Sequence, residues 1–117
     1  MTKRLLYLLQ QSPYMDTRVF EAVDALLVAA AFEQEVSLLF RGAGVLQLLA
    51  NQAPTGQRNL AKILTSLETY EVDNIYANSS DFAANKLKLD DCVITPKLLS
   101  EREIGKLINQ QHLVLND

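Results

Sequence analysis

The stretch Val36-Ser-Leu-Leu-Phe-Arg-Gly-Ala-Gly-Val-Leu-Gln-Leu-Leu-Ala50 contains a short apolar run, two glycines and a second apolar segment. Residues 36–40 have the length of a strand and are almost wholly apolar, which is typical of a strand covered on both faces. Gly42 and Gly44 interrupt the run, and residues 45–50 are predicted as a short helix. The stretch therefore predicts a buried strand that leads through a glycine turn into a helix.

The rest of the chain repeats this alternation of short apolar runs and longer helical segments. The predicted strands are residues 5–9, 36–40, 72–77, 92–94 and 112–115. The predicted helices are residues 18–32, residues 45–50, a segment from about residue 59, residues 79–87 and a segment that starts after residue 100. Strands that alternate with helices predict an α/β fold with a mainly parallel sheet, and right-handed crossovers place helices on both of its faces.

Two of the predicted helices begin with capping signals. Ser79-Ser-Asp81 can cap the short helix over residues 79–87. Ser100, with Glu103 three residues later, matches a capping box, in which the two side chains bond each other's backbone N–H groups. The helix that follows carries Ile104, Leu107 and Ile108 at helical spacing, which predicts one apolar face.

Length and composition favour one domain over residues 1–117. The chain has 117 residues, of which 49% are apolar and 21% charged, and these values exclude a disordered chain. The formal net charge is −3, which argues against a protein that binds nucleic acid alone, because phosphate binding needs clustered Lys and Arg. Cys92 is the only cysteine, so no intrachain disulfide is possible, which fits a reducing compartment.

No segment is predicted to cross a membrane, because the longest wholly apolar run, residues 25–32, is too short. Lys3 and Arg4 before the apolar residues 5–9 imitate the start of a signal peptide, but no small-residue cleavage site follows. We therefore expect a cytoplasmic protein whose first strand is residues 5–9.

Gly42 and Gly44 stand where a strand meets a helix, which is the place where doubly wound folds cradle phosphate groups. The dinucleotide fingerprint requires a third glycine where Gln47 stands. A tight turn that needs positive φ is therefore the favoured interpretation, and a small nucleotide- or flavin-binding module is an alternative.

Cys92 and His112 are the remaining candidates for chemistry. Asp90 and Asp91 precede Cys92 and oppose formation of its thiolate, so a buried thiol in a strand is favoured over a sulfur carrier, which stays an alternative. His112 could act as a general base, but nothing in the sequence ties it to Cys92, and a surface or strand-edge histidine is favoured. One cysteine and one histidine cannot form a zinc cluster, and we expect no cofactor and no metal.

Two surface features remain open. Between residues 19 and 32 only Glu21 and Asp24 are polar, so this helix is either packed inside the domain or covered by another chain. Lys86 and Lys88, with aromatic residues nearby at Tyr76 and Phe82, give a weak signal for nucleic-acid contact. The apolar helix suggests assembly more than chemistry.

Four pieces of the sequence carry a family resemblance: Asp24-Ala-Leu-Leu27, the strand 36–40, Gly44-Val-Leu-Gln-Leu-Leu49 and Gln52-Ala-Pro54. Together they resemble the DsrE/DsrF-like sulfur-relay family, and within it the DsrF-type, TusC-like subunits. The order and spacing of elements agree over nearly the whole chain, and the run from Gly44 is the most specific piece. The resemblance implies a parallel five-stranded sheet between helices, flavodoxin-like in appearance.

The resemblance also implies a function. Such chains join TusB-like and TusD-like chains in a heterohexamer, which passes persulfide sulfur through a TusE-like acceptor toward 2-thiouridine at the tRNA wobble position. A related Dsr complex serves sulfur oxidation. The active cysteine belongs to the TusD/DsrE-type subunit, after the third strand and at the start of the next helix. Asn78 lies near that position here, and Cys92 does not match it. The resemblance therefore implies a non-catalytic accessory subunit without direct nucleic-acid binding.

Overall fold

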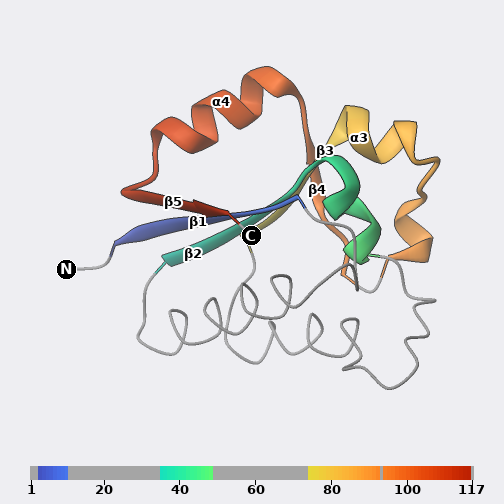
Figure 1. Ribbon diagram of the computed structural model, residues 1–117, viewed down its shortest axis with the longest axis horizontal. Helices are drawn as coiled ribbons and strands as arrows, with labels where there is room; N and C mark the ends of the chain where they lie inside the picture. The colour runs from blue at the N-terminus through green and yellow to red at the C-terminus, as the bar shows by residue number, and fades with distance from the viewer. Residues whose placement is uncertain (1–2, 11–34, 49–73, 93, 117) are drawn as a thin grey trace.

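The computed structural model describes residues 3–10, 35–48, 74–92 and 94–116, and within them a five-stranded sheet with the strand order β4-β3-β2-β1-β5. Every neighbouring pair is parallel, as Figure 1 shows. The strands are β1 (Arg4–Leu9), β2 (Glu35–Phe40), β3 (Asn74–Asn78), β4 (Lys97–Leu99) and β5 (Leu113–Asn116). The predicted α/β fold with a parallel sheet is confirmed.

The neighbouring strands β2 and β1 lie inside the sheet, and their sequences are apolar without alternation because both of their faces are buried. In β2 every residue from Val36 to Phe40 is buried, and in β1 the last four residues are buried. Leu8 of β1 pairs with Leu39 of β2, which in turn pairs with Tyr76 of β3. A parallel strand in the middle of a layered fold has both faces covered, so its successive residues are mostly apolar, and Ser37 is the one buried polar residue of β2.

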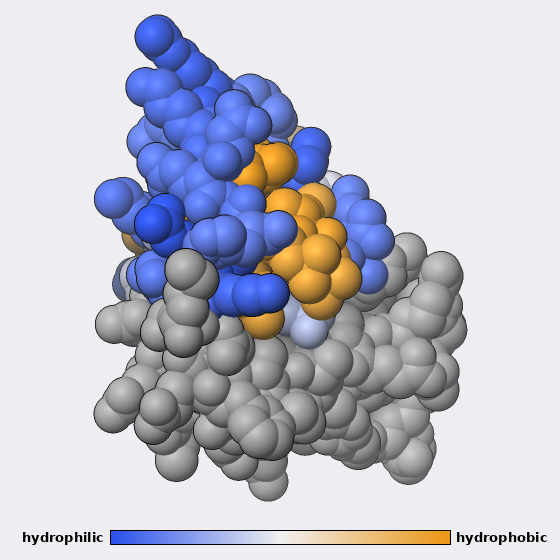
Figure 2. All heavy atoms as spheres, turned by 90° about the vertical axis from the view of Figure 1, so that its left-hand side faces the viewer, coloured by the Kyte–Doolittle hydropathy of each residue, from blue (hydrophilic) through white to orange (hydrophobic). Residues whose placement is uncertain are grey.

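One face of the sheet is covered by α4 (Glu101–Asn109), which lies along the strands in Figure 1. Its apolar face holds Ile104, buried, and Leu107 and Ile108, half-buried, as the helical spacing predicts. Its charged residues are exposed, and hydrophilic residues cover most of the upper part of the described surface in Figure 2. The buried side chains of this core are Leu6, Leu8, Leu39, Leu99 and Ile104, with Tyr76, Leu107 and Ile108 packed against them. The predicted helices over residues 18–32 and from residue 59 lie outside the described residues.

The carboxyl end of the sheet carries the short helices. These are the 3₁₀ helix η1 (Gly42–Leu48), the helix α3 (Ser79–Ala84) and the 3₁₀ turn η3 (Leu89–Asp91). The helix predicted over residues 45–50 thus begins three residues earlier and is of the tighter type. The helix predicted over residues 79–87 ends at Ala84, because Lys86 adopts a left-handed conformation with φ of 56° and its N–H bonds the Ala83 carbonyl.

The prediction of a fourth strand at residues 92–94 is wrong, because β4 begins only at Lys97. The Cys92 N–H bonds the Leu89 carbonyl at 3.2 Å, which places Cys92 at the end of the turn η3. Pro96 has no N–H to give to a strand ladder, so regular pairing starts directly after it. Ile94 is nevertheless buried, so its apolar character reflects a core contact from an irregular segment.

The predicted capping box of α4 is present. The Ser100 hydroxyl accepts a hydrogen bond from the Glu103 N–H at 3.2 Å, and Glu103 Oε1 accepts one from the Ser100 N–H at 3.0 Å. Among the described residues, no helix has the length and apolar character needed to pass through a lipid bilayer.

The capping box makes the stability of α4 depend on pH. The backbone N–H and the hydroxyl of Ser100 lower the pKa of Glu103, and Lys97 and Lys106 lower it further. The ionised form is therefore favoured by folding: its contribution is complete above the unfolded pKa and is lost as pH falls through the folded pKa. We expect Glu103→Ala to lower the free energy of unfolding more at about pH 7 than at about pH 3.

Urea denaturation followed by circular dichroism at both pH values measures this difference. Glu103→Gln is the control, because it keeps an acceptor for the Ser100 N–H but carries no charge. An equal loss for Glu103→Ala at both pH values would contradict the assignment of the carboxylate to the cap.

Candidate functional site

Asn78 is the last residue of β3 and the N-cap of α3, and its side chain is only 1% exposed. Its Oδ1 accepts a hydrogen bond from the Asp81 N–H at 3.1 Å. Its Nδ2 donates to Glu101 Oε1 at 2.6 Å. One buried amide thus connects the first turn of α3 to the first turn of α4.

The capping residue of α3 lies one position before the predicted Ser79-Ser-Asp81 segment. Asn is among the strongest N-caps, since its carbonyl oxygen reaches the N–H groups of the first turn. A serine hydroxyl at the same place could accept from the Asp81 N–H, but the same single oxygen would also have to donate to Glu101. Asn78 uses a separate atom for each bond, and no local pattern in the sequence predicts the contact with Glu101, which is 23 residues away.

The glycine turn joins the same network. The Gly42 N–H donates to Asp81 Oδ2 at 2.7 Å, so Asp81 is bonded to both Gly42 and Asn78. We call Gly42, Asn78, Asp81 and Glu101 the junction network. Within it, three separate segments of the chain meet at the carboxyl end of the sheet through hydrogen bonds.

The backbone conformation and packing explain why glycine stands at positions 42 and 44, and neither explanation involves a ligand. Gly42 has a φ of +53°, a conformation that disfavours other residues, and its N–H is already bonded to a carboxylate. Gly44 packs against the end of β1, where an added Cβ would lie 1.8 Å from the Leu9 carbonyl oxygen, and its N–H bonds the Arg41 carbonyl. This geometry supports the predicted tight turn and gives no support to the alternative, a phosphate-binding loop.

Cys92 is a half-buried free thiol whose sulfur lies 3.5 Å from the Lys88 carbonyl oxygen. Burial raises the pKa of this thiol, and the negative charge of Asp91 raises it further. A higher pKa leaves less thiolate at neutral pH, and the thiolate is the nucleophilic form. The predicted opposition of the aspartates to thiolate formation is confirmed for Asp91.

His112 lies far from Cys92, so the two do not form a catalytic dyad. The imidazole Nδ1 of His112 accepts a hydrogen bond from the Arg4 backbone N–H at 2.9 Å. The backbone N–H of His112 donates to the Arg4 carbonyl at 2.9 Å. These two hydrogen bonds connect the residue before β5 to the start of β1 at one edge of the sheet. Cys92 lies on the segment that leads to β4, the opposite edge.

The lysines and aromatic residues that gave a weak signal for nucleic-acid contact do not form a binding surface in the structure. Lys86 and Lys88 are exposed, but Phe82 is buried in the core and cannot stack on a base. Tyr76 is half-buried and faces α4. Among the described residues, no group of three or more potential ligands could hold a metal ion.

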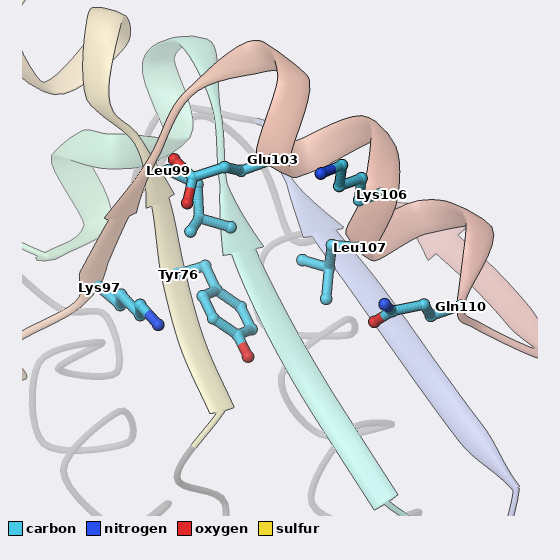
Figure 3. Close-up of a pocket in the computed structure, with 7 residues that line it drawn as sticks. All are labelled: Tyr76, Lys97, Leu99, Glu103, Lys106, Leu107 and Gln110. Atoms are coloured by element: carbon cyan, nitrogen blue, oxygen red, sulfur yellow. The ribbon is translucent and has the colours of Figure 1, made fainter.

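A pocket of about 370 Å³ opens between the edge of the sheet and α4 (Figure 3). Because Tyr76 pairs with Lys97 and Asn78 pairs with Leu99, all four residues lie on the face of the sheet that α4 covers. The pocket is lined by Tyr76 from β3, by Lys97 and Leu99 from β4, and by Glu103, Lys106, Leu107 and Gln110 from α4.

Sequence reasoning missed this pocket for a physical reason. Its lining depends on the register between β3 and β4, whereas the sequence pattern predicts the fourth strand at residues 92–94. The detectable signal was the period of two: Lys97 and Leu99 are two residues apart, as are Tyr76 and Asn78. With β4 in its observed place, that period puts them on one face.

The sequence is similar to those of known proteins over most of its length. The profile of the DsrE/DsrF-like family matches residues 3–116. A protein named TusC homolog from Vibrio parahaemolyticus is 30% identical over 115 residues, which cover 97% of this chain and 98% of that one. The intracellular sulfur oxidation protein DsrF of Allochromatium vinosum is 36% identical over 93 residues, covering 78% of this chain and 68% of that one.

Solved structures show the same fold at lower identity. The ychN protein of E. coli superposes with a TM-score of 0.85 at 15% identity, with all of both chains covered. A protein of unknown function from Methanobacterium thermoautotrophicum superposes with a TM-score of 0.72 at 13% identity, covering 98% of this chain and 99% of that one. The family profile spans almost the entire sequence, and so the chain belongs to the DsrE/DsrF-like family.

Proposed function

We propose that this chain is a non-catalytic, TusC-like subunit of a cytoplasmic sulfur-transfer complex with TusB-like and TusD-like chains. The observation that carries the proposal is that an asparagine, Asn78, and not a cysteine, stands at the end of the third strand. Asn78 lies at the junction of the third strand with the following helix. By the resemblance to the family, this is near the position of the active cysteine of the TusD/DsrE-type subunit. An asparagine amide cannot hold a persulfide, and Asn78 is already committed to two hydrogen bonds.

The chemistry of a sulfur relay requires a thiolate at the acceptor. That thiolate attacks the outer sulfur of the donor persulfide, the donor S–S bond breaks, and the donor leaves as a thiolate. Cys92, with its raised pKa, is poorly suited to this attack. The proposal therefore assigns the persulfide cysteine to the TusD-like partner, and to this chain the completion of the assembly.

The names of the relatives support a sulfur relay and leave two end products. TusC homologs from Vibrio parahaemolyticus and Aliivibrio fischeri match at 30% and 28% identity over more than nine tenths of the chain. We place the complex on the route to 2-thiouridine at the tRNA wobble position, with a TusE-like acceptor. The DsrF relative, at 36% identity, supports sulfur oxidation as the second candidate.

Replacing Cys92 tests whether the chain itself carries sulfur. In a complex reconstituted from this chain, its TusB-like and TusD-like partners and a TusE-like acceptor, we expect Cys92→Ser to leave the rate of sulfur transfer unchanged. Serine is nearly isosteric with cysteine, so the half-buried site stays filled. Transfer of ³⁵S to the acceptor measures the rate.

Substitution of the strand-end cysteine of the TusD-like chain by serine is the matched control, and it should abolish transfer. If Cys92→Ser instead stops transfer in a complex that still assembles, Cys92 is the sulfur carrier and the accessory role is wrong.

A further inference from the structure

The pocket under α4 presents two cationic side chains to one space. Lys97 from β4 and Lys106 from α4 both line it, and both are exposed (Figure 3). Both lysines interact electrostatically with the carboxylate of Glu103, which also lines the pocket. Two lysines on different elements thus border one space in which a negatively charged group can lie between them.

Glu103 shows that the two lysines act on the same region. Its pKa is lowered first by the backbone and side chain of Ser100 and then by Lys97 and Lys106. One of its oxygens is held by the Ser100 N–H, so the carboxylate is fixed to the cap of α4. Two lysines and one glutamate leave a net charge of 2 − 1 = +1 on the lining.

The remaining lining of the pocket is partly apolar. Leu99 is buried, Leu107 and Tyr76 are half-buried, and Gln110 adds an amide at the α4 end. The volume of about 370 Å³ is near the lower end of the roughly 300–1,000 Å³ typical of ligand pockets. The space therefore fits a small group with a short apolar stem and a charged end.

We propose that this pocket binds an organic carboxylate on a short aliphatic stem, with its charge between Lys97 and Lys106 and its stem on Leu99 and Leu107. A net charge of +1 matches a monoanion, and the fixed carboxylate of Glu103 repels a dianion such as hydrogen phosphate more strongly than a monoanion. The carboxylate is supplied by a free acid or by a glutamate side chain of a protein. This proposal does not depend on the sulfur-transfer function.

Titration of the ¹⁵N-labelled full chain with butyrate, followed by NMR, tests the proposal. We expect saturable shifts of the backbone resonances of Tyr76, Leu99 and Leu107, and no such shifts with butyramide, its neutral analogue. The double variant Lys97→Gln/Lys106→Gln should weaken butyrate binding by about tenfold or more, because two charge-assisted contacts are lost. Lys86→Gln removes an exposed lysine elsewhere and should leave the affinity unchanged.

A second titration with a short peptide that carries one glutamate between alanines separates the two sources. Tighter binding of the peptide than of butyrate assigns the site to a protein partner, and tighter binding of butyrate assigns it to a free acid. The proposal is overturned if neither probe shifts these resonances, if butyramide or phosphate binds as well as butyrate, or if the double variant binds butyrate like the wild type.

Discussion

Gly44→Ala is expected to lower the free energy of unfolding by about 3 kcal/mol or more, because the new methyl group meets only backbone. The added Cβ would lie 1.8 Å from the Leu9 carbonyl oxygen and 2.5 Å from its carbon. Neither atom can turn away as a side chain would. To make room, η1 must move off the end of β1, and Val45 and Leu48, both fully buried, must leave their places in the core.

Gly105→Ala is the matched control for this substitution. Gly105 lies inside α4, and a Cβ there meets nothing within 4 Å. Alanine is a better helix former than glycine, so we expect a gain of about 0.5–1 kcal/mol in the free energy of unfolding. Urea denaturation followed by circular dichroism measures both variants. A Gly44→Ala protein as stable as the wild type would contradict the close approach of η1 to β1.

Asn78→Asp is expected to lower the free energy of unfolding by about 2 kcal/mol or more at neutral pH. Aspartate caps a helix as well as asparagine does, so the bond to the Asp81 N–H is kept. The bond to Glu101 is not kept, because the donating amide, 2.6 Å from Glu101 Oε1, becomes a second carboxylate. Two negative charges then meet at a side chain that is only 1% exposed.

Acid should relieve this loss. Burial and the charge of Glu101 raise the pKa of the new carboxyl group above its unfolded value. Its favourable contribution is then complete below the unfolded pKa and is lost as pH rises through the folded pKa. The free energy lost by the variant, relative to the wild type, should therefore be smaller at about pH 4 than at about pH 8.

A second substitution checks that the contact with Glu101 is the cause. In Asn78→Asp/Glu101→Gln the amide and the carboxylate change places, and most of the lost stability at neutral pH should return. If the double variant is no more stable than Asn78→Asp, the bond between the two side chains contributes little to the free energy of unfolding, and the expected effect of Asn78→Asp has another cause.

The sequence was most informative where one physical requirement acts on adjacent residues. The strands β1 and β2 are buried on both faces, so their apolar runs identify them directly. The capping box of Ser100 and Glu103 is a contact between residues three apart, and it was predicted correctly. Gly42 needs a positive φ, which its residue type already indicates.

It was least informative where distant segments determine the outcome. β4 has only three residues, and its position after Pro96 depends on pairing with β3 rather than on its own composition. Asn78 was noted only for its position in the chain, because its partner Glu101 lies on another helix. The pocket under α4 requires the β3–β4 register, so no local pattern could predict it.

The measurement that tests the central claim most directly is native mass spectrometry of the tagged chain purified from its own cells. The proposal predicts a complex with two other chains of similar size in equal amounts, with an added sulfur atom on a cysteine of the TusD-like partner and none on Cys92. A chain that purifies alone, as a monomer or as copies of itself, or a complex in which the sulfur is bound to Cys92, would contradict the accessory role.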